Sequence, residues 1–515
     1  MKTITLQLLF AVLIAWVSHS QNAQAVNPPP DGGYPGGNTA EGLAALLSLT
    51  TGGFNTAVGF FSLRSDTTGQ LNTGVGAGTL LANLGDSNTA TGAGALLSNT
   101  TGAQNTATGA FALVSNTEAN NNTASGFSAL LNNTIGQENV AIGAQALREN
   151  TEGNRNTASG AFALNQNITG NDNTATGEAA LTANTTGDGN TATGDSALRS
   201  NTTGFGNTAT GIATLEFNIG GTFNTADGAD ALFTNTTGNN NTAIGHNALN
   251  QNVDGSNNTG TGAAALQQNT TGIQNTADGA SALLNNQTGG NNTANGFQAL
   301  KANTTGGFNT ASGINALVNN IGGSSNTALG DSAGFNVTTA NHVICIGANV
   351  QGENVSHTCY IGNIFGVTSS GGAGVLVNAD GKLGTATSSR RFKTEIKSME
   401  QTSEMLYALK PVTFRYSKEI DSTGIRQLGL VAEDVEEVSP DLIVRDKDGK
   451  PYSVRYDQVN AMLLNEFLKE HRTVMELKKE IAALAATVKE QSAQIQKVCA
   501  HLEIQEPNAA IAQNQ

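Results

Sequence analysis

A pattern of small, polar and apolar residues recurs along most of the chain, close to N-T-A-x-G-x-x-A-L-x-x-N-T-T-G-x-x. It starts eighteen times between Asn38 and Asn326, at a spacing of 17 residues except for one 16-residue step from Asn72 to Asn88. A fixed period of this kind indicates a stack of repeats rather than a globular domain. Seventeen residues are too few for two helices and a turn, so helical repeats fit poorly.

Each repeat predicts one coil of a parallel β-solenoid. N-T-A is expected to form a short strand, and the Gly after it a turn with positive φ. The A-L pair should point inward, and N-T-T-G should form a second turn. The predicted fold class is therefore mainly β, a solenoid or β-roll of 18 coils over residues 38–334. The stacked Asn side chains could form amide ladders or could simply suit tight turns, and both readings stay open.

Each coil offers little apolar surface: one Leu, one or two Ala and an occasional Phe. Burying a Leu contributes about 1.5–3 kcal/mol, whereas ordering the backbone costs about 1–2 kcal/mol per residue. We therefore expect several chains, with three as the preferred number, to share one core. The N-T-A-x-G-x-x-A phrase and its variant at residues 139–143 resemble the head repeats of trimeric autotransporter adhesins, although the period here is longer. That resemblance implies a trimeric left-handed β-roll.

The first residues carry the features of a secretory signal. Lys2 precedes an apolar stretch over residues 6–17, and a small-residue cleavage site ends at Ala25. Residues 26–37, rich in Pro and Gly, are interpreted as a flexible lead-in. The expected location of the mature protein is secreted or at the cell surface.

Charge narrows the choice of partners. The net charge is −15, and the repeats hold five Lys/Arg against seventeen Asp/Glu. Nucleic acid and anionic lipid need clustered cations, so an acidic shaft argues against both. The expected partners are further copies of the chain, in a homotrimer, and an extracellular surface or receptor that the sequence does not identify. No motif calls for a cofactor or a metal.

After residue 334 the 17-residue period stops, and residues 335–387 are interpreted as a β neck that ends the solenoid. Three runs in the neck are expected to be strands or a strand with a turn, at residues 342–347, 360–364 and 374–384. Cys345 and Cys359 could pair in an oxidising compartment, or either could be a small buried apolar residue. Cys499 would then be left unpaired.

Residues 388–460 are ordinary in composition and predict a small α+β domain. Its expected elements are strands at 412–416 and 427–431, an acidic helix at 432–438, and a hairpin around residues 446–450. A helical pattern follows from Asp457, and residues 461–505 predict a coiled coil before a disordered tail at 506–515. The apolar heptad positions are Phe467, Val474, Leu477, Ile481, Leu484, Val488, Ile495, Val498 and Leu502. A trimer again fits.

One motif points to chemistry. Ser388 and Lys393 resemble the S-D-x-R-x-K motif of the endosialidase-type intramolecular chaperone, a self-cleaving serine peptidase family found at the ends of phage tailspikes. Later blocks at residues 410–414 and 429–435 resemble that family in the same order. The resemblance implies that Ser388 is the nucleophile, that Lys393 is the general base, and that the bond from Thr387 to Ser388 is cut once per chain. Ser389 stands where the family usually has Asp.

Two further functions compete with a secreted, adhesin-like fibre that carries a self-removing chaperone. Regularly spaced Thr on a solenoid face could bind ice or another crystal, although we expect only one Thr per strand instead of a double row. A phage-type tail fibre would explain the C-terminal domain, but the signal sequence argues against it. Calcium-binding repeats are disfavoured because G-G-x-G-x-D does not recur.

Overall fold

The computed structural model describes residues 34–367 and 369–503. The expected signal peptide at 1–25, the lead-in up to residue 33 and the tail at 506–515 lie outside these residues. The chain divides into two units, Met1–Val367 and Thr368–Gln515, which are described separately. Among the described helices, none has both the length and the apolar character to cross a membrane.

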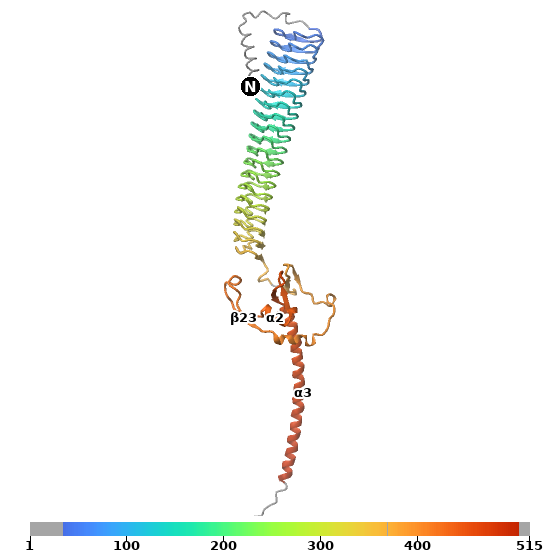
Figure 1. Cartoon of the computed structure of the whole chain (residues 1–515), viewed down its shortest axis with the longest axis vertical. Helices are drawn as coiled ribbons and strands as arrows, with labels where there is room; N and C mark the ends of the chain where they lie inside the picture. Colours follow the sequence, from blue (N-terminus) through green and yellow to red (C-terminus); the bar gives the residue numbers. More distant parts are fainter. Residues whose placement is uncertain (1–33, 368, 504–515) are drawn as a thin grey trace, which may run out of the picture. The chain divides into compact units, whose positions relative to one another are not determined.

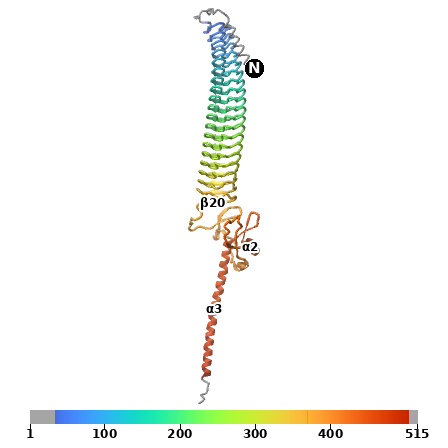
Figure 2. The ribbon, with the colours of Figure 1, turned by 90° about the vertical axis from the view of Figure 1, so that its left-hand side faces the viewer.

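The first unit is a parallel β-solenoid, as the repeat predicts (Figure 1, blue to yellow). Twenty strands of three residues form one sheet, each strand pairing with the equivalent strand of the next coil. The strands are β1 (Thr39–Glu41), β2 (Thr56–Val58), β3 (Thr73–Val75), β4 (Thr89–Thr91), β5 (Thr106–Thr108), β6 (Thr123–Ser125), β7 (Val140–Ile142), β8 (Thr157–Ser159), β9 (Thr174–Thr176), β10 (Thr191–Thr193), β11 (Thr208–Thr210), β12 (Thr225–Asp227), β13 (Thr242–Ile244), β14 (Thr259–Thr261), β15 (Thr276–Asp278), β16 (Thr293–Asn295), β17 (Thr310–Ser312), β18 (Thr327–Leu329), β19 (Ile344–Ile346) and β20 (Cys359–Ile361). Figure 2 shows the same stack from the side.

The middle residue of each strand points into the solenoid, and the outer two point away from it. In β10, for example, Ala192 is buried while Thr191 and Thr193 are exposed. The first position is Thr in every strand from β1 to β18 except β7, which has Val140. The third position is also Thr in six strands: β4, β5, β9, β10, β11 and β14. The expectation of a single Thr per strand is therefore wrong for these six.

The core of the solenoid lies within one chain. In the tenth coil, Ala192, Ala197 and Leu198 are all 0% exposed, and nearly every other coil repeats this. The expectation that chains share one core is wrong, because each Leu and Ala is covered by its equivalents in the coils before and after it. The interior is narrow enough for small side chains to fill.

In most coils, two Asn and one Gly form one hydrogen-bonded unit. The backbone N–H of Asn190 donates to Asn173 Oδ1 at 2.9 Å, and Asn201 Nδ2 donates to Asn184 Oδ1 at 2.8 Å. Both side-chain amides, Asn190 Nδ2 and Asn201 Nδ2, also donate to the Gly204 carbonyl at 2.9 Å. Both readings of the Asn pattern therefore hold, since the amides form a ladder between coils and also close the turn.

The recurring glycines follow from close packing between coils. A Cβ on Gly204 would lie 2.4 Å from Asn201 Oδ1 and 2.5 Å from the carbonyl oxygen of Gly221. Gly194, the Gly after the strand, has φ +135°, and a Cβ there would lie 2.3 Å from the oxygen of Gly211. The predicted positive φ is confirmed. A side chain at Gly194 or Gly204 would force the neighbouring coil to shift, although Ala119 and Ala340 take the place of Gly204 in two other coils.

The ladder of strands continues beyond the last 17-residue repeat. β19 pairs in parallel with β18, and β20 pairs with β19, so the solenoid extends two strands past the predicted end at residue 334. Strands can pair through their backbones without the N-T-A sequence, so the solenoid continues after the 17-residue period has stopped. Cys345 is buried and Cys359 is exposed, and both thiols are free.

The second unit follows the predicted order of elements. It contains β21 (Val375–Val377), β22 (Leu383–Thr385), the 3-10 helices η1 (Arg390–Phe392) and η2 (Glu400–Ala408), β23 (Val412–Phe414), β24 (Gln427–Gly429), α2 (Ala432–Val438), η3 (Pro440–Leu442), β25 (Ile443–Arg445), β26 (Pro451–Val454) and α3 (Tyr456–Glu503). Three antiparallel pairs form, β21–β22, β23–β24 and β25–β26. The predicted acidic helix and hairpin are confirmed.

The second unit has a small core and a large exposed apolar surface. Its buried apolar residues are Val435, Leu442, Ile443, Val454 and Met462. All residues of β21 and β22 are exposed, as are Phe392 and Leu428. The nine predicted heptad residues of α3 are exposed as well. In contrast to the solenoid, a single chain leaves this unit open.

Asp66 occupies the place in the second coil that later coils give to the ladder Asn. It is fully buried, and its Oδ1 accepts the Gly69 N–H at 2.7 Å. The amide ladder donates from each coil to the one before it, so an acceptor-only carboxylate can begin it. Burial nevertheless raises the pKa of Asp66 above its ordinary value of 3.8.

We predict that Asp66→Asn stabilises the solenoid at pH 7. The folded state holds the proton on Asp66 more tightly than the unfolded state does. The contribution of Asp66 to the free energy of unfolding is therefore greatest below pH 3.8, and it is lost as the pH rises through the raised pKa of the folded state. The variant should show a higher Tm at pH 7 than the native chain and a flatter Tm profile above pH 4. Asp188→Asn, at an exposed position, is the control and should change neither. A lower Tm for Asp66→Asn at pH 7 would contradict this account.

Candidate functional site

The predicted cleavage site lies on an exposed segment between β22 and η1. Ser388 and Ser389 are exposed, and Ser389 is extended with φ −65° and ψ 134°. The single turn of η1 follows, closed by the Lys393 N–H donating to the Arg390 carbonyl at 3.1 Å. The guanidinium of Arg391 lies over the Phe392 ring at 4.8 Å.

In a single chain, the predicted nucleophile and the predicted base are not hydrogen-bonded to each other. Ser388 and Lys393 are both exposed, and within residues 369–503 no hydrogen bond links them. Thr387, on the other side of the predicted cut, is exposed too. A protease could reach this segment, but the chain alone does not hold it in an attack geometry. The residue roles stay predictions.

A polar cluster missed from the sequence links η2 to the start of α3. Glu466 is only 8% exposed and accepts hydrogen bonds from the Ser403 hydroxyl, from Tyr407 OH at 3.0 Å and from Lys469 Nζ at 2.8 Å. Asn465 Nδ2 donates to the Glu400 carbonyl at 3.0 Å and to Ser403 Oγ at 2.6 Å. We call Ser403, Tyr407, Asn465, Glu466 and Lys469 the η2–α3 cluster.

The hydrogen bonds of the η2–α3 cluster favour the ionised form of Glu466. The Lys469 ammonium, followed by the Ser403 hydroxyl, lowers the pKa of Glu466 below its ordinary value of 4.5. The same carboxylate raises the pKa of Tyr407 above 10.0 by accepting its hydrogen bond. The sequence could not reveal the cluster, because Ser403 and Glu466 are 63 residues apart and Glu466 sits among the charged residues of a predicted coiled-coil helix.

The η2–α3 cluster joins the long helix to η2, an element that follows the cleavage segment in the sequence. Only six residues separate Lys393 from the start of η2, and the first turns of α3 contribute Met462 to the core of the unit. The predicted boundary between domain and coiled coil therefore falls inside one continuous helix, whose first part packs on the domain. Only the rest of α3 remains free to pair with other copies.

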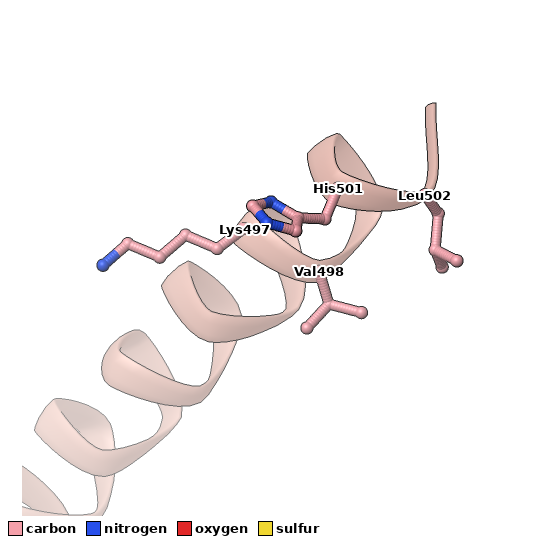
Figure 3. Close-up of a pocket in the computed structure, with 4 residues that line it drawn as sticks. All are labelled: Lys497, Val498, His501 and Leu502. Carbon is pink, nitrogen blue, oxygen red and sulfur yellow. The ribbon is translucent and has the colours of Figure 1, made fainter. Parts of the chain in front are cut away.

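A shallow depression on the last turns of α3 is lined by Lys497, Val498, His501 and Leu502 (Figure 3). All four come from one exposed helix and their side chains point outward in different directions, so they do not converge on a ligand. Across residues 34–367 and 369–503, no three His, Cys, Asp or Glu side chains gather as a metal site would require.

Comparison with known proteins supports a chaperone domain at this place. Residues 388–444 match the family model described as chaperone of endosialidase, a peptidase family. The resemblance seen in the sequence motif is thereby confirmed for the C-terminal domain, and the match begins at Ser388. No curated protein matches the chain. A β-solenoid followed by a domain of this kind fits a trimeric fibre, of the tail-fibre or tailspike type, that carries its own chaperone.

We predict that Glu466→Gln loosens η2 from α3. A neutral amide keeps the shape of the side chain but loses the charge-assisted bond from Lys469. Backbone amides of residues 400–408 should exchange hydrogen several-fold faster in the variant at pH 7. Because the folded pKa of Glu466 is lowered, native protection should be present above pH 4.5 and lost as pH falls below it, whereas the variant should lack this dependence. Glu470→Gln, exposed one turn later, is the control, and equal exchange in both variants would contradict the role of the cluster.

Proposed function

We propose that this chain is a secreted, adhesin-like fibre whose C-terminal domain assembles three copies and then cuts itself off between Thr387 and Ser388. The observation that carries the proposal is the chaperone-of-endosialidase match, which begins at Ser388 directly after a self-contained solenoid and neck.

The contrast between the two units supports assembly through the C-terminal domain. The solenoid buries its Leu and Ala within one chain, whereas α3 exposes an apolar stripe along most of its length. A stripe at a and d positions is buried when helices of several copies wrap around one another. The exposed strands β21 and β22 and the exposed Phe392 are further surfaces that other copies can cover.

The proposed reaction uses side chains of the cleavage segment. The Ser388 hydroxyl attacks the Thr387 carbonyl carbon and passes its proton to the Lys393 amine, and the Ser388 amide nitrogen leaves as an amine after receiving a proton. The resulting ester is hydrolysed by water, which leaves a Thr387 carboxylate and a new N-terminus at Ser388. A lysine surrounded by water is protonated at neutral pH, so it must be desolvated or crowded by cations to act as a base. Assembly would supply the desolvation that a single chain lacks.

Autocleavage is the first prediction of this proposal. The full-length chain should convert, without added protease, into a shaft and a fragment that starts at Ser388, as read by N-terminal sequencing. Ser388→Ala should abolish conversion, and Lys393→Ala should slow it by at least about 100-fold, since a positioned base contributes roughly 10²–10⁴. Ser389→Asp, which restores the family residue, should preserve or speed the reaction. Conversion of Ser388→Ala, or a fragment with another N-terminus, would sink the assignment.

Assembly should precede cleavage. Leu477→Asp places a charge in the apolar stripe of α3 and should yield monomers that do not convert, as measured by light scattering and gel electrophoresis. Ala486→Asp introduces the same charge at an outward heptad position and should leave both the trimer and the conversion intact. A native protein with the mass of one chain, or a Leu477→Asp monomer that converts normally, would refute the coupling.

A second candidate, ice binding, draws support from the six strands that carry Thr at both outward positions. Acidic residues interrupt the third-position row at Glu41, Asp227 and Asp278, which breaks a regular hydroxyl lattice. We therefore expect neither thermal hysteresis nor inhibition of ice recrystallisation from the purified shaft. Clear activity in either assay would place ice binding above the fibre proposal.

A further inference from the structure

The outward face of the sheet changes character at its last three strands. The outward side chains of β18, β19 and β20 are Thr327 and five residues that we call the terminal patch: Leu329, Ile344, Ile346, Cys359 and Ile361. The four aliphatic side chains of the patch are each 37–43% exposed, and Cys359 is exposed as well. Figure 2 labels β20 at the end of the stack.

The register joins these residues into one surface. Leu329, Ile346 and Ile361 are paired across the three strands, and Ile344 is paired with Cys359. Neighbouring strands lie about 4.8 Å apart, so the five side chains are contiguous. In the middle of the sheet, by contrast, Ile142 lies between Ser125 and Ser159 and Ile244 between Asp227 and Thr261. The terminal patch is therefore a local feature and does not belong to the repeat.

We propose that the terminal patch is the surface through which the shafts of three copies hold together, with a second and third copy of this chain as the occupant. This inference rests on the proposed trimer and its cleavage. All five residues precede the cut at Thr387, so they stay on the shaft when α3 and its apolar stripe are removed. Each solenoid closes its own core, so a trimer that outlasts cleavage needs a contact on the shaft side of the cut.

Charge favours other copies as the occupant. The repeats over residues 38–334 carry seventeen acidic against five basic residues, so parallel copies repel one another along most of their length. The outward positions of β18, β19 and β20 hold no charged side chain, and apolar contact can be made there without desolvating a carboxylate. Twenty-six residues separate Ile361 from Ser388, so assembly of the C-terminal domain brings three patches to a high effective concentration.

The test uses Ile346→Asp, with Thr193→Asp as the matched control at the same strand position in mid-shaft. Mass is measured by light scattering in two settings: the self-cleaved protein after removal of the C-terminal fragment, and the uncleaved Ser388→Ala chain. We expect native and Thr193→Asp shafts to remain trimers after cleavage, and Ile346→Asp shafts to separate into monomers. The uncleaved Ser388→Ala/Ile346→Asp chain should still be a trimer, held by α3.

Several outcomes would overturn the inference. Cleaved Ile346→Asp shafts that stay trimeric, or cleaved native shafts that fall apart, would exclude the patch as the contact. Cys359 should stay protected from a maleimide after cleavage in a Cys499→Ser chain, and labelling that begins on cleavage would show that the removed domain had covered it instead. A monomeric Ser388→Ala chain with the native patch would refute the proposed trimer itself, which separates that failure from failure of the patch.

Discussion

The structure depends on hydrogen bonds that pass from each coil to the next. The two buried Asn of a coil donate to the coil before and to the same Gly carbonyl, and the Gly has no room for a side chain. A buried amide without partners costs about 1–3 kcal/mol, so each coil is stable only when correctly stacked on another. Because coils are nearly identical, a stack shifted by one coil satisfies almost the same bonds. Each coil therefore contributes a similar amount to the stability of the stack, and the sequence specifies only weakly which coil stacks on which.

The two units differ in how much of their apolar surface a single chain buries. The solenoid satisfies its own amides and buries its own Leu and Ala, so a finished shaft needs little from the rest of the chain. The C-terminal unit has few buried residues and an apolar helix stripe, which makes it a poor isolated domain but a suitable place for copies to meet. The η2–α3 cluster joins α3 to η2, which begins seven positions after Lys393.

Much of the fold could be predicted from the sequence because it follows from local rules. The short strand in each repeat, the Gly with positive φ, the inward Ala-Leu pair and α2 were all expected, since each depends on period, turn chemistry or composition. The strand was expected at N-T-A, and the structure places it one residue later, at T-A-x. The prediction that several chains share one core was wrong, because a count of one Leu per coil ignores the burial that the coils before and after it provide. The extent of the solenoid was also missed, since β19 and β20 pair through the backbone while their side chains depart from the pattern.

The sequence names candidates for the site but not its polar surroundings. Ser388 and Lys393 could be named because their spacing resembles a family motif, and in the described residues both side chains are exposed. Ser403 and Glu466 carried no signal, because a contact across 63 residues between η2 and α3 follows no local pattern. Long-range polar contacts of this kind are set by the whole fold.

On this account, the C-terminal domain is needed while the coils of the shaft are being aligned, and it is no longer needed once the shaft has formed. The most direct measurement is recovery after denaturation, comparing the self-cleaved shaft with the uncleaved Ser388→Ala chain under the same conditions. The account predicts similar resistance to unfolding for the two, but native trimer regained only by the uncleaved chain, while the shaft returns as mixed, misaligned species. Equal recovery of native trimer by both would contradict it.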